Sequence, residues 1–289
     1  MKTLHSLVKE KQVASWILML VVTGLMALML ASCDEDAVNA DNLAEDQESV
    51  QSEDNDDFFI DDAEDIGFGL LEEETSSGGK VAEETDERVA CAVVARTGSI
   101  DAGTITIDFG DGCTGPRGNV RQGTIVINFT GRRSVPGSSW TVEFVDYSIN
   151  GVSISGTITV TNISENDTLV LKLDMDNGVI TWPDGSIARR RFHRIRTHER
   201  DENNLLDRLI VFGTAEGNHR NGRGFQIEIL EPLVYNRRCV PEGVFIPVEG
   251  VKLIKHGQRQ ITVDYGDGRC DNTVTITNKN GRSWQYTVE

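Results

Sequence analysis

Apolar and polar residues alternate through most of residues 88–289, and this alternation is typical of β-strands. In one such run Ile105, Ile107 and Phe109 fall on one face, and Thr106 and Asp108 fall on the other. We expect further strands in the runs 123–129, 140–149, 152–161, 168–173, 179–182, 187–198, 208–215, 224–230, 251–255, 261–265, 272–277 and 283–288. No long segment of this part of the sequence has helical periodicity.

Dipeptides that favour tight turns separate these runs. Such dipeptides supply the positive φ angles that two-residue hairpins require. They are Pro136-Gly137, Asn150-Gly151, Asn177-Gly178, Asp184-Gly185, Asn221-Gly222 and Asn280-Gly281. Consecutive hairpins place neighbouring strands antiparallel, so the sequence predicts an all-β fold, a largely antiparallel meander. A sandwich, a curved sheet and a barrel-like form all fit this pattern, and we expect residues 88–289 to form one domain.

The N-terminus has the order of a secretory signal. Three lysines precede an apolar stretch at residues 13–30, and Leu30-Ala31-Ser32 leads directly into Cys33. This end resembles the bacterial lipobox, which implies that residues 1–32 are cleaved and that Cys33 carries the lipid. The alternative is an uncleaved transmembrane helix. With several acyl chains on Cys33, we expect the membrane to be a partner through the lipid alone.

The negative charge of the chain lies almost entirely in residues 33–87. The formal net charge is −18, and residues 34–87 contain 22 Asp or Glu against one basic residue, Lys80. So much like charge predicts a mostly disordered, lipidated tether. An apolar cluster that includes Phe58, Phe59 and Ile60 interrupts it. This cluster is expected either to dock on the domain's own surface or to bind a partner.

The tether begins with Asp34-Glu35-Asp36, directly after the lipidated residue. This run resembles the acidic export signal of Bacteroidota lipoproteins. The resemblance implies an outer-membrane lipoprotein exposed at the cell surface, with a periplasm-facing protein as the alternative.

Four cysteines remain after Cys33, an even number in a compartment that permits disulfides. An internal repeat relates residues 105–113 to residues 261–270, and each copy ends in a cysteine and is preceded by another. The repeat favours two bridges, Cys91 with Cys113 and Cys239 with Cys270. Zinc is the alternative, but no spacing is C-x-x-C.

The two repeats also contain paired carboxylates, Asp108 with Asp111 and Asp264 with Asp267. Calcium binds carboxylates in flexible loops, but the spacing is not that of an EF-hand. We therefore expect tight turns at these positions, with no metal and no cofactor.

A basic run is the least expected feature of the strands. In extended form it places Arg191 on one face and Arg194, Arg196 and His198 on the other. Guanidinium groups recognise carboxylate, phosphate and sulfate, so these four residues are candidates for binding an anion. The alternatives are pairing across strands with acidic neighbours and pairing with the chain's own acidic tether. Nucleic acid is not expected, because the domain has no broad basic surface.

The lipobox, the acidic tether and the two Gly-Asp-Gly repeats together resemble a group of uncharacterised Bacteroidota lipoproteins. That resemblance implies no activity and no functional residues. Thr168, within Asp167-Thr168-Leu169, matches the short O-glycosylation sequence of that phylum.

The sequence contains none of the motifs G-x-S-x-G, H-E-x-x-H or P-loop. It therefore favours a non-enzymatic binding or structural module of the envelope, with an anionic glycan or an envelope protein as partner. The alternative is a surface or periplasmic enzyme that acts on polysaccharide. A deep cleft with facing carboxylates would favour the enzyme, and a shallow β surface would favour binding.

Overall fold

The computed structural model describes residues 34–76, 86–203 and 206–288. The proposed signal peptide and Cys33 lie outside these residues. The chain divides into two compact units, and the second, Ser49–Glu289, contains all the strands and the C-terminal part of the helix α2. Within the described residues, no helix combines the length and the apolar character that crossing a membrane requires.

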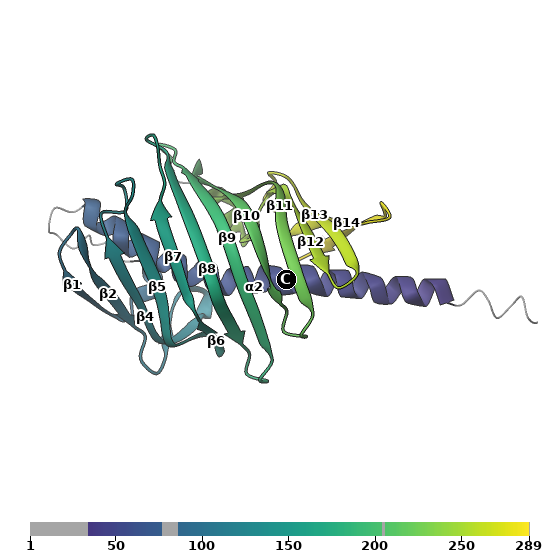
Figure 1. The fold of residues 1–289 in the computed structure, drawn as a ribbon, viewed down its shortest axis with the longest axis horizontal. Helices are drawn as coiled ribbons and strands as arrows, with labels where there is room; N and C mark the ends of the chain where they lie inside the picture. The colour runs from purple at the N-terminus through teal and green to yellow at the C-terminus, as the bar shows by residue number, and fades with distance from the viewer. Residues whose placement is uncertain (1–33, 77–85, 204–205, 289) are drawn as a thin grey trace, which may run out of the picture. The chain divides into compact units, whose positions relative to one another are not determined.

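The fold is mostly β, and its strands form one antiparallel sheet that follows chain order almost throughout (Figure 1). The expected antiparallel all-β fold is thereby confirmed. The strands are β1 (Val93–Gly98), β2 (Ala102–Asp108), β3 (Cys113–Thr114), β4 (Val120–Thr130), β5 (Ser139–Ile149), β6 (Val152–Ser155), β7 (Thr157–Asn162), β8 (Leu169–Thr181), β9 (Ile187–Glu199), β10 (Arg208–Asn218), β11 (Gly224–Asn236), β12 (Glu249–His256), β13 (Arg259–Asp267), β14 (Thr273–Asn278) and β15 (Ser283–Thr287). Among the described residues, short 3-10 helices precede β1 and lie between strands: η1 (Glu87–Val89), η2 (Pro116–Gly118) and η4 (Arg237–Glu242).

Most of the expected turn dipeptides join consecutive strands. Asn150 and Gly151 link β5 to β6 with φ angles of 53° and 79°, as a two-residue hairpin requires. Asn177-Gly178 is the exception, because it lies inside β8, at a bulge in its pairing with β9. The prediction of a hairpin there was wrong. A β-bulge and a tight turn both use glycine, so the dipeptide alone does not distinguish them.

The structure differs from the expected tether in residues 34–76, which form one α-helix, α2 (Asp34–Ser76). The prediction of disorder considered the acidic segment alone, where like charges repel and helix formation is costly. In the folded chain the segment from Ser49 onward lies on one face of the sheet (Figure 1). Packing and cations of the sheet therefore compensate for the repulsion. The expectation that the apolar cluster docks on the domain's own surface is confirmed.

The core lies between α2 and the sheet. Ile60, Ala63, Ile66 and Leu70 recur at helical spacing on α2 and are buried. They pack with the inward side chains of the strands, which include Ile105, Ile107, Ile125, Ile127, Val142, Ile158, Val160, Leu171, Leu173 and Phe192. The helix thus supplies the second layer that a sheet with one apolar face requires.

Both expected disulfides are present. Cys91 is bonded to Cys113 and Cys239 to Cys270, with Cα atoms 5.6 Å and 5.0 Å apart. The first bridge ties the segment before β1 to β3, and the second ties η4 to the loop after β13. Each bridge thus encloses one hairpin, β1 with β2 in the first copy of the repeat and β12 with β13 in the second.

Candidate functional site

A line of cations runs across the sheet face that α2 covers. We call it the cation strip, and it comprises Arg121 of β4, Arg190, Arg194 and Arg196 of β9, and Lys252 of β12. Each of these side chains is less than a tenth exposed. Charged groups are buried at this depth only when partners compensate for their lost hydration.

The partners at the centre of the strip are carboxylates of α2. The Arg190 guanidinium donates to both oxygens of Glu53, at 2.9 Å and 2.6 Å, and to Asp57 at 2.7 Å. Arg194 also donates to Asp57. Glu53 and Asp57 are four residues apart, so they lie on the same helix face.

The same arrangement continues one helical turn further along α2. Arg196 donates to Asp61 at 2.6 Å and to Glu64 at 2.5 Å. Arg194 reaches Asp61 at 3.3 Å, so this carboxylate bridges two arginines. The acidic face of α2 and the basic residues of β9 therefore form one continuous network.

Two further pairs hold other parts of the helix. Lys252 Nζ donates to Asp54 at 2.9 Å, and the same oxygen accepts the Tyr265 hydroxyl at 3.0 Å. Arg121 binds both oxygens of Asp62, with contacts of 2.7 to 3.0 Å. Cations from β4, β9 and β12 thus fix the helix across the sheet.

The carboxyl groups of α2 differ in the direction in which their pKa values are shifted. Burial raises the pKa of Asp56 to about 8, against a smaller opposing effect of Arg190. Burial raises the pKa of Glu64 in the same way, also to about 8. For Asp57 burial again acts upward, but Arg190 and Arg194 outweigh it and lower the pKa below its ordinary value. Burial and ion pairing therefore shift the pKa values of neighbouring carboxyls in opposite directions.

The structure separates the four candidate anion-binding residues. Arg194 and Arg196 face α2 and bind its carboxylates, which was one of the alternatives considered. The His198 ring stacks on Phe68 of α2, with centroids 4.7 Å apart. Arg191 points to the opposite face and pairs with Glu216 of β10, as expected for cross-strand pairing. The four therefore do not form a single site, because successive side chains of a strand alternate between faces.

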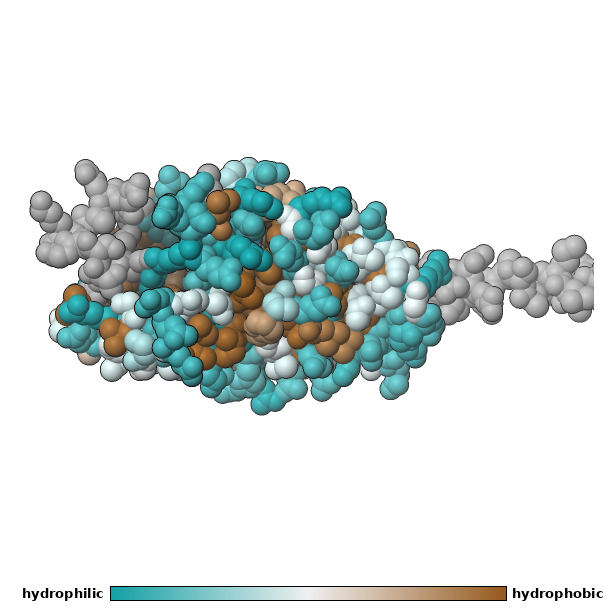
Figure 2. Space-filling model, turned by 90° about the horizontal axis from the view of Figure 1, so that it is seen from above, coloured by the Kyte–Doolittle hydropathy of each residue, from teal (hydrophilic) through white to brown (hydrophobic). Residues whose placement is uncertain are grey.

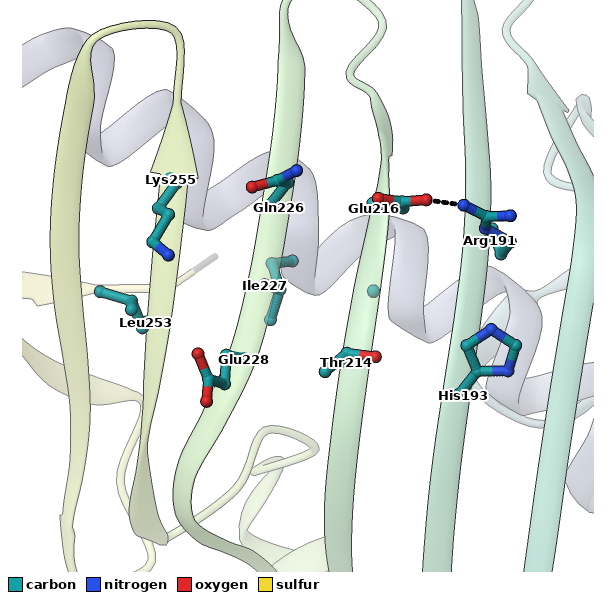
Figure 3. A pocket seen from close by; sticks show the side chains of 10 residues that line it. Arg191, His193, Thr214, Glu216, Gln226, Ile227, Glu228, Leu253 and Lys255 are labelled. Carbon is teal, nitrogen blue, oxygen red and sulfur yellow. Dashed lines mark hydrogen bonds and ion pairs between the residues drawn. The ribbon is translucent and has the colours of Figure 1, made fainter.

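The opposite face carries a shallow pocket, which we call the outer pocket, with a volume of about 340 Å³. Figure 3 shows its side chains projecting from four adjacent strands, with α2 on the far side of the sheet. One register row contains Arg191, Glu216, Gln226 and Lys255. The next row contains His193, Thr214, Glu228 and Leu253.

The outer pocket presents both hydrogen-bond donors and acceptors. The sheet forms the floor of the pocket, and an ion pair joins Arg191 to Glu216 (Figure 3). His193 Nδ1 lies 2.7 Å from a carboxylate oxygen of Asp174 on β8. Further along β10 the outer face becomes apolar at Phe212, whose side chain is 43% exposed.

The remaining candidate residues lie apart from both sites. Thr168 is exposed in the bend just before β8, where a modification could be accommodated. Asp108 and Asp264 each accept a hydrogen bond at 2.8 Å from the backbone N–H two residues later, as in a tight turn. No group of three or more His, Cys, Asp or Glu side chains suited to a metal occurs among the described residues.

Sequence reasoning missed the acidic face of α2. Glu53, Asp57, Asp61 and Glu64 are spaced by four, four and three residues, which is the spacing of one helix face. Ile60, Ala63 and Ile66 repeat with a similar period. Both spacings are present in the sequence, but the high density of charge in this segment led to the prediction of disorder.

Comparison with known proteins gave no match to this chain among protein-family models, curated proteins or solved structures.

Proposed function

We propose that this protein is a lipid-anchored, non-enzymatic binding module of the cell envelope, and that its outer pocket binds a glycan. One observation carries the proposal: neighbouring strands β9 to β12 display a pocket lined by polar and charged side chains on the face opposite α2. The buried arginines of the inner face are already bound by carboxylates of the helix, so an external anionic ligand is expected on the outer face.

The chemistry of the outer pocket suits a saccharide. Sugar hydroxyls both donate and accept hydrogen bonds, and Gln226, Thr214 and Glu228 offer both functions within a small area. Lys255 and Arg191 add positive charge that favours acidic sugars or sulfate groups. Phe212, exposed on the same face of β10, provides an apolar surface for the C–H face of a sugar ring.

The anchor is inferred from the lipobox alone. Acylation of Cys33 would hold the protein on a membrane, and the acidic residues that follow favour the cell surface over the periplasmic face. The lipid would then be the membrane contact, leaving the sheet free to bind.

Binding is favoured over polysaccharide cleavage by the arrangement of the carboxylates. Glu216 and Glu228 both line the outer pocket, but Glu216 is held in an ion pair with Arg191. Glycoside hydrolysis requires two carboxyl groups on opposite sides of the scissile bond, one acting as acid. These two residues instead project from one open surface. An enzyme remains the alternative proposal.

The test is a binding screen of the full-length protein, purified in detergent, against anionic and neutral polysaccharides and lipopolysaccharide. Lys255→Glu in the outer pocket is compared with Lys279→Glu, which makes the same charge change in the exposed turn between β14 and β15. We expect salt-sensitive binding of an anionic polysaccharide that falls at least tenfold in Lys255→Glu and is unchanged in Lys279→Glu.

A second variant, Gln226→Ala, removes hydrogen bonds without changing charge and should also weaken binding. If no saccharide binds, or if both lysine variants lose affinity equally, the outer pocket is not a glycan site.

A further inference from the structure

A second concavity runs beside α2, lined by the helix, by the inner face of β9 to β12, by η4 and by the segments around Pro116 and Val288. We call it the side groove, and its volume is about 940 Å³. Its apolar walls include Phe58, Val211, Ile229, Leu233, Val240 and Phe245. An open groove of this size with a largely apolar lining has the character of a small-molecule site.

Bulged segments of β10 and β11 line the side groove. The pairing of β10 with β11 shifts between Val211 and Thr214, and β11 shifts twice against β12 between Ile229 and Val234. Such bulges bend a strand and sharpen its twist. At Gly213, with φ of 139°, an added Cβ would come within 2.1 Å of a backbone oxygen of β9, so this bend requires glycine.

The charged residues around the side groove are matched within the chain. Arg194 is bound by Asp57 and Asp61, and Lys252 is bound by Asp54. At the rim Arg237 lies 3.6 Å from Asp207. The surface left for a ligand is therefore the apolar wall, which favours burial of hydrocarbon over recognition of charge.

The rim of the side groove is also apolar. Phe58, Val240 and Phe245 are 37%, 41% and 41% exposed. Figure 2 shows apolar residues gathered in the middle of one face of the molecule, bordered by hydrophilic residues. Exposed apolar surface of this kind marks ligand or partner sites.

We propose that the side groove binds a long acyl chain. Its volume lies at the upper end of the range for small-ligand cavities, which suits a long flexible chain. A further helix is a poor occupant, because α2 already covers the strip and the volume is equal to only about two helical turns. The proposal is independent of the outer pocket, which lies on the other face of the sheet.

The test uses residues 34–289 purified without detergent, which would itself fill the groove. Native mass spectrometry and calorimetry measure binding of hexadecanoic acid, octanoic acid and a zwitterionic lysophospholipid with a sixteen-carbon chain. We expect one hexadecanoic acid per chain, and octanoic acid at least tenfold weaker. If the lysophospholipid binds as well, the groove accepts the acyl chain of a membrane lipid. If only hexadecanoic acid binds, the ligand is a free fatty acid.

Two variants assign the binding to the side groove. Ile229→Trp fills it, and Val145→Trp places the same bulk at a half-exposed position of β5 outside the groove. Val240→Asp puts a charge at the exposed rim, where folding should be unaffected. We expect Ile229→Trp and Val240→Asp to lose at least tenfold in affinity and Val145→Trp to bind normally. If none of the lipids binds, or if both groove variants bind as the natural chain does, the proposal is wrong.

Discussion

Asp56 and Asp57 are adjacent in the sequence, yet the pKa values of their carboxyl groups shift in opposite directions. Neither oxygen of Asp56 has a hydrogen-bond partner among the described residues, and the nearest guanidinium atom, of Arg190, is 4.0 Å away. Asp57 contacts both Arg190 and Arg194. The pKa of Asp56 is therefore raised to about 8, and the pKa of Asp57 is lowered. Adjacent residues of a helix point in different directions, so Asp57 reaches both arginines and Asp56 forms no hydrogen bond with either.

These shifts predict opposite pH dependences for two isosteric variants. Since the folded pKa of Asp56 exceeds its ordinary value of 3.8, its contribution to stability is complete below about pH 4 and is lost as the pH rises to 8. Asp56→Asn should therefore gain stability relative to the natural chain over that interval. Asp57 contributes stability above pH 4 and loses it at lower pH, so Asp57→Asn should be destabilised at pH 7 and less so in acid. Urea unfolding at several pH values measures both, and a constant difference for Asp56→Asn would contradict the assignment.

At the scale of elements, α2 and β9 are joined by buried ion pairs whose partners depend on one another. Removing one member of such a pair leaves an uncompensated charge and costs about 3–5 kcal/mol. Arg190→Leu should therefore lower the free energy of unfolding by about that amount, because Glu53 loses its bidentate partner.

The double variant Arg190→Leu with Glu53→Leu should recover much of this loss, since apolar replacements of a whole pair are often tolerated. Denaturant unfolding of the two single variants and the double variant gives the coupling energy. Additive losses would show that the two side chains act independently.

At the scale of the whole molecule, the C-terminal part of α2 is a layer of the fold. It buries apolar side chains against the sheet and neutralises five cations. A chain that begins at Glu87 would expose both the cations and the apolar face of the sheet, and we expect it to aggregate. A chain that begins at Ser49 should remain soluble and unfold cooperatively. Circular dichroism and sedimentation distinguish the two, and a soluble, cooperative chain from Glu87 would show that the helix is dispensable.

Features that depend on short-range patterns were predictable from the sequence. Alternation along the chain indicated the strands, Asn-Gly and Asp-Gly dipeptides indicated most hairpins, and the internal repeat indicated which cysteines are bonded. Each of these depends on residues close together or on two similar segments, so local geometry is enough to predict them.

The conformation of the acidic segment depends instead on contacts between residues far apart in the sequence. The bond between Arg196 and Glu64 spans 132 residues of sequence, and no local pattern joins the two. Alone, the carboxylates of residues 53–65 repel one another, but in the fold they meet arginines that alternate along β9. The same contacts decided that Arg194 and Arg196 are internal partners of the helix and that Arg191 faces outward. Burial couples these distant charges, because a cation removed from water is stable only beside its carboxylate.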